Sequence, residues 1–345
     1  MCKENVNCLQ NGFEMKIKKN PLVVIIASNY NGASYLYKKH NILWHVFSSL
    51  RRTKYQNYKI LMADDKSTDR SVEYVKKKFP YIDIVVNNSN GGFSKNNNKA
   101  IKYAIQKYKP DYIMLLNNDI IITDDLWLNK LVNIAKPNPR IGIVGCKLSY
   151  PSGKIQHAGM EIGYYGARNI GRGKDDFSEF NYVKEVEGVT FAAVLINKEV
   201  IKKIGLFDEN FFMGFEDVDY YLRTTKAKFK IYYSGNVKLI HLEGFTSTNS
   251  KFQKIKYNSF YYNQVNYWYF MLKYRYMEQF RGINRLKSIF IFFISSIISI
   301  EGQDRERKLS NIKFKDKPLT RLLLTIKAIS QAKKVYTRLN KTDYF

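Results

Sequence analysis

The first 120 residues alternate between short apolar runs and longer stretches with helical periodicity. The apolar runs predict strands at residues 22–28, 59–63, 82–86 and 112–116. Between them, helices are expected up to about residue 52 and over residues 71–79 and 95–108. Apolar strands that alternate with helices are typical of a doubly wound α/β sheet. The predicted fold class is therefore α/β, with a Rossmann-like, mostly parallel sheet.

Polar clusters follow these predicted strands, at the point where each apolar run stops. They occupy residues 29–32, 64–69, 87–92 and 117–119. In doubly wound sheets, ligands bind beyond the carboxyl ends of the strands. The sequence therefore places a candidate binding site at this edge of the sheet.

The rest of the chain changes character twice. Frequent glycines between residues 142 and 173 indicate mixed strands and a loop on the side where a second substrate would bind. From residue 246 to the end, 20 Lys or Arg residues stand against 6 Asp or Glu residues. We therefore expect an N-terminal arm over residues 1–20, an α/β domain over residues 21–250 and a basic, aromatic, helical C-terminal region over residues 251–345.

Composition limits the classes of protein and of partner. With 345 residues, 45% of them hydrophobic, the chain is neither disordered nor of low complexity. Its formal net charge of +27 indicates a polyanionic neighbour, either nucleic acid, an anionic lipid surface or nucleotide phosphates. The charge alone does not choose among these three.

The cysteines and apolar segments bear on the compartment. Three scattered cysteines, Cys2, Cys8 and Cys146, are too few for a disulfide framework or a zinc site and suggest a reducing compartment. Residues 1–20 contain no apolar run of signal-peptide length. Residues 286–300 form an apolar stretch of fifteen residues, where a membrane-spanning helix needs about twenty, so a buried or interfacial helix is expected. We therefore expect a cytoplasmic protein.

Two adjacent carboxylates close the second predicted strand, Asp64 and Asp65. Residues of this kind often cap a helix by accepting its free backbone N–H groups, and Ser67 or Asp69 would serve that purpose. A carboxylate at a strand end also accepts hydrogen bonds from a base or ribose in doubly wound nucleotide sites. Both interpretations stay open for this cluster.

A candidate metal site follows the fourth predicted strand. Asp119 stands where the apolar run ends, after the amides Asn117 and Asn118. Mg²⁺ and Mn²⁺ take oxygen ligands and need few of them from the protein. The alternative is a turn-forming Asn-Asn-Asp sequence. His241 stands at the end of a later apolar run. It is either a structural residue or a ligand of the metal ion.

A third cluster places three acids within four positions after Gly214: Glu216, Asp217 and Asp219. At a helix start these acids complement the helix dipole. Repulsion among them also raises at least one pKa, which suits a general base. Arg223 lies four residues after Asp219 and is expected to pair with it on one helical face.

Taken together, these clusters resemble the family-two inverting glycosyltransferases with a GT-A fold, especially the rhamnosyltransferase-like branch. The resemblance covers about residues 21–245 and rests on the order and spacing of six motifs: NYNG at 29–32, DDKSTD at 64–69, NGGFSKNNN at 90–98, LLNND at 115–119, GLFDENFFMGFEDVDYYLR at 205–223 and IH at 240–241. It implies transfer of a sugar from a nucleotide-diphosphate sugar to an acceptor hydroxyl.

The resemblance also implies roles for individual residues. The position of Asp217 resembles that of the catalytic base in this family, and Glu216 would support this base. Asp119 would bind Mn²⁺ or Mg²⁺, together with Asn117, which replaces the first Asp of the family's D-x-D motif, and His241. The donor nucleotide sugar would contact residues at the other strand ends and in the acid cluster: Asn29, Asn31, Asp64, Asp65, Asn90, Gly92, Asn97, Asn118 and Arg223. Asn96 and Lys228 depart from the family, which usually has glycine at both positions.

The C-terminal region combines aromatic and basic residues. Ten aromatic residues lie between residues 257 and 276, interleaved with Lys256, Lys273 and Arg275. Three roles are open for these aromatic residues. They could stack on nucleic-acid bases, lie at a bilayer interface or pack the region onto the α/β domain. Between residues 319 and 329 an apolar stripe with basic neighbours predicts a basic amphipathic helix: Leu319, Leu322, Leu323, Ile326 and Ile329.

The sequence therefore favours a metal-dependent inverting glycosyltransferase, peripheral on the inner face of the cell membrane. Its expected partners are a nucleotide sugar, a glycan or lipid-linked acceptor and an anionic membrane surface; nucleic acid is not expected. One alternative is a nucleic-acid-binding protein with a non-catalytic α/β scaffold. Another is a sugar nucleotidyltransferase, although NYNG is too short for the glycine-rich phosphate loop of that class. The sugar, the acceptor and the oligomeric state stay open.

Overall fold

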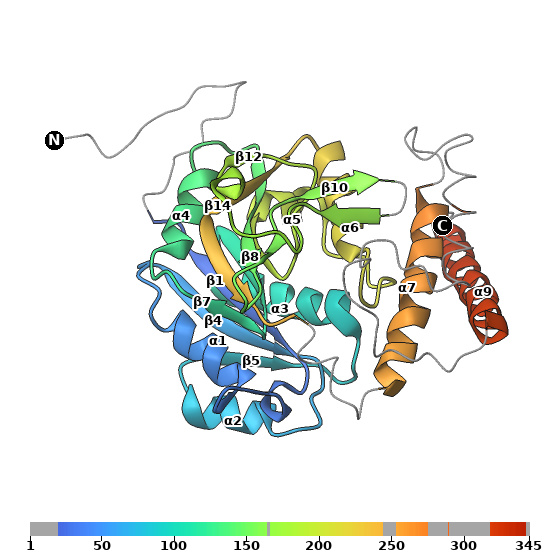
Figure 1. The fold of residues 1–345 in the computed structure, drawn as a ribbon, viewed down its shortest axis with the longest axis horizontal. Coiled ribbons are helices and arrows are strands. Elements are labelled where there is room, and N and C mark those ends of the chain that lie inside the picture. The colour runs from blue at the N-terminus through green and yellow to red at the C-terminus, as the bar shows by residue number, and fades with distance from the viewer. Residues whose placement is uncertain (1–19, 164–165, 244–252, 275–288, 290–317, 343–345) are drawn as a thin grey trace.

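The computed structural model describes residues 20–163, 166–243, 253–274, 289 and 318–342. Within this part of the chain, one large sheet has the strand order β12-β14-β8-β13-β6-β1-β4-β5 (Figure 1). These strands are β1 (Val23–Asn29), β4 (Tyr58–Asp64), β5 (Asp83–Val86), β6 (Tyr112–Asn117), β8 (Ile141–Ser149), β12 (Val183–Glu185), β13 (Ala193–Asn197) and β14 (Lys230–His241).

The sheet is mostly parallel, as predicted. β6, β1, β4 and β5 run parallel to one another. β14 runs parallel to β8, whereas β13 is antiparallel to both of its neighbours and β12 is antiparallel to β14. Two short strands lie outside this order and pair antiparallel with the ends of inner strands, β7 (Ile120–Ile122) with β14 and β9 (Ile155–His157) with β8.

Two hydrophobic layers enclose the sheet because successive residues of its strands face opposite sides. Val23, Ile25 and Ala27 of β1 pack with α1 (Ile42–Leu50), α2 (Ser71–Lys78) and α4 (Trp127–Ala135). Val24 and Ile26 face α3 (Gly92–Tyr108), α5 (Lys198–Ile204) and α6 (Glu216–Lys226). Helices on both faces confirm the doubly wound arrangement.

The predicted helix that ends near residue 52 begins only at Ile42. After β1 the chain forms a short 3₁₀ turn, η1 (Gly32–Ser34), and a small hairpin of β2 (Leu36–Tyr37) and β3 (His40–Asn41). Asn31 and Lys38 have positive φ values of 55° and 53°, which interrupt a helix, so α1 starts only at Ile42. The remaining short elements are β10 (Met160–Gly163), β11 (Gly166–Asn169) and η2 (Ser178–Phe180).

In the described residues of the C-terminal region there are two helices, α7 (Gln253–Lys273) and α9 (Pro318–Thr342), which lie side by side beyond α6 (Figure 1). Together with Phe211, Val218 and Leu222 they form a third hydrophobic cluster. The aromatic side chains at positions 267–270 of α7 are buried. These side chains therefore pack inside the protein and present no free stacking surface.

The face of α9 that packs against the rest of the protein differs from the predicted stripe. Leu324, Ala328, Ala332 and Val335 are buried there, at helical spacing. Leu323 and Ile326 are instead 54% and 50% exposed. The apolar segment at residues 286–300 lies outside the described residues, apart from residue 289. Among the helices that the structure describes, none combines the length and the apolarity that crossing a membrane requires.

Candidate active site

Asn29 joins three of the predicted strand-end loops. Its amide nitrogen donates to Asp64 Oδ2 at 2.8 Å, and its amide oxygen accepts from Asn118 Nδ2 at 2.8 Å and from the backbone N–H of Gly32. Asp64 is fully buried and also accepts from the backbone N–H and the hydroxyl of Ser67. Asn29, Asp64 and Asn118 therefore fix the ends of β1, β4 and β6 relative to one another.

Asp65 holds the glycine-rich loop that leads into α3. Its carboxylate accepts from the backbone N–H groups of Gly91 and Gly92, at 2.9 and 2.8 Å, and from Asn87 Nδ2. Asn90, beside these glycines, is exposed. Asn31 makes a similar connection, because its amide oxygen accepts from the backbone N–H of Thr68 at 2.7 Å. The predicted nucleotide contacts therefore lie in loops that the carboxylate and amide groups hold in place.

Gly92 connects this loop to the segment that leads into α6. It has a φ of +76°, and a Cβ at this position would lie 2.1 Å from the carbonyl oxygen of Phe212. The same oxygen accepts a 2.8 Å hydrogen bond from the backbone N–H of Phe93. No other residue fits in place of Gly92, so the loop and the Phe212 segment are in direct contact.

Asn97 is more deeply buried than a residue that contacts the nucleotide from a loop would be. It is fully buried, accepts from the Ser28 hydroxyl at 2.7 Å and donates to the carbonyl oxygen of Phe93. Its neighbour Asn96, where the family usually has glycine, donates to the carbonyl oxygen of Ala63. Both amides tie α3 to the ends of β1 and β4.

Asp119 and His241 meet because β7 pairs with the end of β14. His241 Nε2 lies 3.0 Å from Asp119 Oδ1. On the other side of the ring, Nδ1 lies 2.6 Å from Gln156 Oε1, and the amide nitrogen of Gln156 donates to Glu243. Since this amide oxygen can only accept, Nδ1 carries a proton and Nε2 is the nitrogen available to a ligand.

The Asp119 and His241 pair fits a divalent metal ion. Oδ1 of Asp119 is buried and faces Nε2 of His241, so both atoms point at the same place. No described group of three or more His, Cys, Asp or Glu side chains is arranged to hold a metal ion. A catalytic Mg²⁺ or Mn²⁺ needs only one or two protein carboxylates when phosphates and waters complete its shell. Asn117, at the end of β6, makes no side-chain hydrogen bond within the described part of the chain.

The acid cluster begins α6 directly after a strained turn. Gly214 and Phe215 have φ values of +92° and +70°. Asp219 is fully buried and pairs with Arg223 at 2.8 Å, as predicted, and with Lys273 at 2.6 Å. Arg223 also donates to the carbonyl oxygens of Ile204 and Leu206. The charge of Asp219 is therefore compensated, which leaves Glu216 and Asp217 as the chemically available acids.

Burial raises the pKa of both remaining acids. For Glu216 the nearby Asp217 carboxylate raises the pKa further. Oε2 of Glu216 is buried without a hydrogen-bond partner among the described residues, whereas Asp217 is half-buried. When two like charges compete, one group keeps its proton. We therefore assign the proton to the enclosed Glu216 and the ionised state, near neutral pH, to Asp217.

Sequence reasoning missed the partners of these groups. Gln156 carries no strand-end signal and reaches His241 only through the fold, because 85 residues separate the two. Asn266 of α7 donates to the carbonyl oxygens of Met213 and Gly214, at 2.9 Å each. As a polar residue within an aromatic helical stretch, Asn266 could have been recognised as a buried hydrogen-bonding group.

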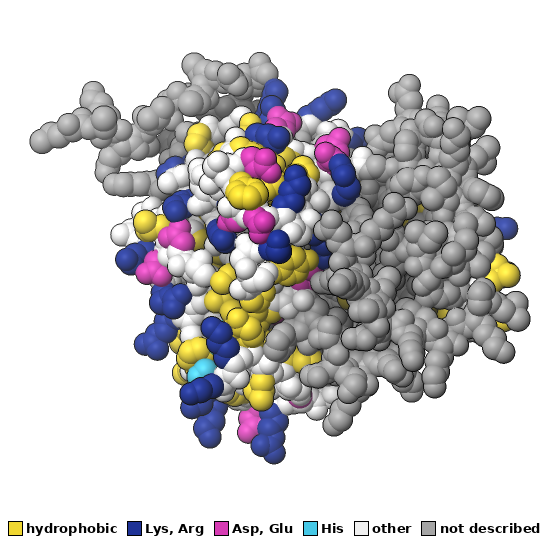
Figure 2. Space-filling model, in the orientation of Figure 1, with side chains coloured by type: hydrophobic (Ala, Val, Ile, Leu, Met, Phe, Trp, Pro, Cys, Tyr) yellow, Lys and Arg dark blue, Asp and Glu magenta, His cyan; other side chains and the backbone are white. Residues whose placement is uncertain are grey.

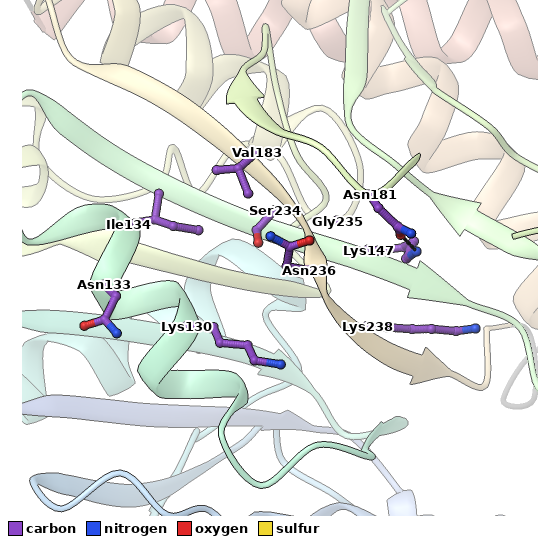
Figure 3. Close-up of a pocket in the computed structure, with 10 residues that line it drawn as sticks. All are labelled: Lys130, Asn133, Ile134, Lys147, Asn181, Val183, Ser234, Gly235, Asn236 and Lys238. Atoms are coloured by element: carbon purple, nitrogen blue, oxygen red, sulfur yellow. Dashed lines mark hydrogen bonds between the residues drawn. The ribbon is translucent and has the colours of Figure 1, made fainter. Parts of the chain in front are cut away.

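A separate surface hollow lies between α4 and β14 (Figure 3). Its lining includes Lys130, Lys147 and Lys238 and none of the predicted site residues. Lys147 and Lys238 both pair with Asp176, and Lys130 pairs with Asp124. Because these lysines already have carboxylate partners, we assign no ligand to this hollow.

Comparison with known proteins gives a consistent picture. The family model described as "Glycosyl transferase family 2" matches residues 24–205. The O-antigen biosynthesis protein RfbC of Myxococcus xanthus is 29% identical over 207 residues, which cover 57% of this chain and only 16% of that protein. Rhamnosyltransferase WbbL of Escherichia coli is 25% identical over 205 residues, which cover 54% of this chain and 73% of that protein.

Solved structures resemble the chain over most of its length. The mannosyltransferase PcManGT from Pyrobaculum calidifontis, in complex with GDP-Man and Mn²⁺, has a TM-score of 0.53 at 13% identity and covers 94% of this chain and 80% of its own. GalNAc-T7, solved with UDP, GalNAc and Mn²⁺, has a TM-score of 0.55 at 14% identity and covers 85% of this chain and 54% of its own. At these identities the likeness concerns the fold.

Proposed function

Because the chain belongs to glycosyl transferase family 2, we propose that it transfers a sugar from a nucleotide-diphosphate sugar to an acceptor hydroxyl, with inversion at the anomeric carbon. Membership of this family supports a glycosyltransferase activity. The donor, the metal, the catalytic base and the acceptor are our proposals. The observation that carries them is the pair Glu216 and Asp217 at the start of α6, in a segment that contacts the loop held by Asp65.

The donor nucleotide would bind over the strand-end loops. Asp65, Asn90 and Gly92 shape the loop nearest to the Phe212 segment, and Asn31 shapes the loop after β1. Asn29, Asp64, Asn97 and Asn118 support this surface from beneath, since their hydrogen bonds are to the protein. Arg223 supports the neighbouring acid cluster in the same way. The nucleotides named with the similar structures, GDP-Man and UDP, make a nucleotide donor the natural test ligand here.

Asp119 and His241, with Asn117 beside them, would hold Mn²⁺ or Mg²⁺. When bound there, the ion neutralises negative charge on the leaving diphosphate. His241 presents Nε2 because Gln156 fixes the proton on Nδ1. The pair Gln156 and Glu243 thereby orients the imidazole ring toward Asp119.

Asp217 would act as the general base. Its carboxylate takes the proton of the acceptor hydroxyl while that oxygen forms a bond to the anomeric carbon and the bond from this carbon to the diphosphate oxygen breaks. The leaving group departs as the nucleoside diphosphate, and no covalent enzyme intermediate forms. Glu216, which keeps its proton, adds no second negative charge beside the base.

We propose a lipid-linked acceptor and a peripheral position on the cytoplasmic face of the membrane. Leu323 and Ile326 of α9 are exposed, and Lys327, Lys333 and Lys334 are exposed as well. Apolar and basic side chains on one accessible helix surface favour binding to anionic lipid. On the face shown in Figure 2, by contrast, the basic side chains of the described residues are interspersed with acidic ones. On that face, the described residues form no continuous basic stripe that would favour nucleic acid.

A donor screen tests the proposed function. In the presence of Mn²⁺, one of UDP-glucose, dTDP-rhamnose and GDP-mannose is expected to raise the thermal unfolding temperature. At a free donor concentration of one hundred times its Kd, the stabilisation is about 2.7 kcal/mol. Removing the metal with EDTA should abolish this effect. If no nucleotide sugar or nucleoside diphosphate stabilises the protein, the proposed donor class is wrong.

A charge substitution on α9 tests the membrane proposal. The double variant Leu323→Glu and Ile326→Glu should bind phosphatidylglycerol-containing liposomes at least tenfold more weakly in a flotation assay, because both positions are exposed. The matched control is Leu36→Glu with Phe177→Glu, which adds the same charge at equally exposed sites away from α9. Equal losses in the two double variants would contradict a specific role of α9. If the wild-type protein prefers DNA to liposomes at physiological salt, the nucleic-acid alternative gains.

A further inference from the structure

One face of α7 contacts the segment that carries the acid pair. Tyr262, Asn266, Tyr269 and Lys273 are spaced by four, three and four residues, which places them on one side of a helix. Tyr262 stacks on Phe212 with ring centroids 4.4 Å apart. Tyr269 packs on the ring of Phe211. Polar contacts from this face reach the residues on both sides of the strained turn.

Asn266 holds the turn itself. Its side chain is 1% exposed, and its amide nitrogen lies 2.9 Å from the carbonyl oxygens of both Met213 and Gly214. An amide group has two N–H donors, and here one serves each carbonyl. The next residue, Phe215, has a φ of +70°, a conformation that a bulky side chain adopts only when its surroundings enforce it. The two hydrogen bonds supply that enforcement directly before Glu216.

Lys273 and its neighbours hold the two ends of the segment. The Lys273 ammonium lies 2.6 Å from Asp208 Oδ2 and 2.6 Å from Asp219 Oδ1. The hydroxyl of Tyr269 donates to Asp208 at 2.8 Å, and that of Tyr274 donates to Asp219 at 2.7 Å. Asp208 precedes the turn and Asp219 follows the acid pair. The whole stretch from Asp208 to Asp219 is therefore attached to α7 at its beginning, at its turn and in its helix.

We propose that α7 is a part of the active site and that Asn266 is a positioning residue for the acid pair. This inference rests on the proposed role of Asp217 as the base. By fixing the carbonyl oxygens of Met213 and Gly214, Asn266 sets where the first turn of α6 begins. That placement keeps Glu216 buried and leaves Asp217 partly exposed, so that an acceptor hydroxyl can reach its carboxylate.

The test replaces the amide of Asn266 without changing its size. In Asn266→Leu both donors are lost, so hydrogen exchange at the backbone amides of residues 213–218 should become at least tenfold faster, measured by mass spectrometry. The control is Val265→Ala, which shortens a buried side chain of the same helix that makes no hydrogen bond to the turn. Exchange in residues 213–218 should stay at the wild-type rate in this control. If Asn266→Leu does not fold, Asn266→Ser, which keeps one donor, replaces it.

Turnover separates positioning from a purely structural role. We expect Asn266→Leu to lower kcat for nucleoside diphosphate release from the best donor of UDP-glucose, dTDP-rhamnose and GDP-mannose by about 10- to 100-fold, since a displacement of about 1 Å at the reacting groups has that effect. Donor Kd should change less than threefold. Val265→Ala should keep its kcat.

The outcomes are distinguishable. Unchanged exchange in residues 213–218 overturns the inference, whether or not a donor is turned over. Faster exchange with wild-type kcat also overturns it, provided that Asp217→Asn is inactive in the same assay. If Asp217→Asn keeps its turnover, the proposed base is wrong, and this failure is independent of the result for Asn266. The inference is supported if Asn266→Leu changes both the local exchange rate and kcat while Val265→Ala changes neither.

Discussion

Asp217→Asn is expected to lower the turnover number by about 10²- to 10⁴-fold while donor binding survives. The substitution keeps the size of the side chain and one hydrogen-bonding oxygen, but the amide cannot accept the proton of the acceptor hydroxyl. Sugar transfer is measured at saturating donor, and donor affinity is measured by calorimetry for the same variant. A large loss of kcat at constant Kd indicates a group that acts in the transition state.

Glu216→Gln is the matched comparison for this variant. Because burial and the Asp217 carboxylate raise the pKa of Glu216, the wild-type side chain already carries a proton and resembles an amide. Its replacement should therefore cost much less than that of Asp217. An inactive Glu216→Gln beside an active Asp217→Asn would exchange the two roles. Normal turnover in both variants would move the base outside this pair.

Asp119→Ala is expected to abolish metal-dependent donor binding. Asp119 contributes the carboxylate of the proposed metal site, and without it Asn117 and His241 offer only uncharged donor atoms to the ion. Calorimetry with the nucleoside diphosphate and Mn²⁺ measures the effect. The wild-type protein should bind with an affinity that EDTA lowers, and the variant should show weak binding that EDTA does not change.

Asn117→Ala serves as the control for Asp119. A neutral amide ligand contributes less than a carboxylate to a hard cation, so this variant should keep metal-dependent binding with a reduced affinity. Asp119 would have to be removed from the ligand set if Asp119→Ala retained wild-type affinity that still required the metal. A complete loss in Asn117→Ala alone would make the amide the principal ligand.

The sheet could be predicted from the sequence because its central strands are buried on both faces. The apolar runs at residues 59–63 and 112–116 therefore mark β4 and β6 to within one residue at each end. The start of the helix that ends near residue 52 could not be predicted, since the residues before it include left-handed conformations that an apolar pattern does not reveal. Local periodicity did not reveal which face of α9 packs against the rest of the protein, because its neighbour α7 is more than forty residues away.

That the acids at the strand ends lie close together could be predicted from the sequence, whereas the partner of each acid could not. Acids at strand ends attract attention because the fold brings those ends together. Asp64 and Asp65 look alike in the sequence, yet Asp64 bonds to Asn29 and Ser67, whereas Asp65 bonds to the glycine loop. These partners are up to 35 residues distant. Contacts of Asn266 with a turn more than fifty residues earlier lie equally beyond local pattern.

The attachment of the acid segment to α7 has a consequence for synthesis on the ribosome. Residues emerge from the N-terminus onward, so the sheet strands up to β14 and the strand-end loops leave the exit tunnel before α7 does. Until Asn266 and Lys273 have emerged, the turn at Gly214 and Phe215 lacks the groups that hold it, and Asp208 and Asp219 lack their shared cation. The nascent chain would therefore acquire a surface for the donor first and the ability to activate an acceptor last.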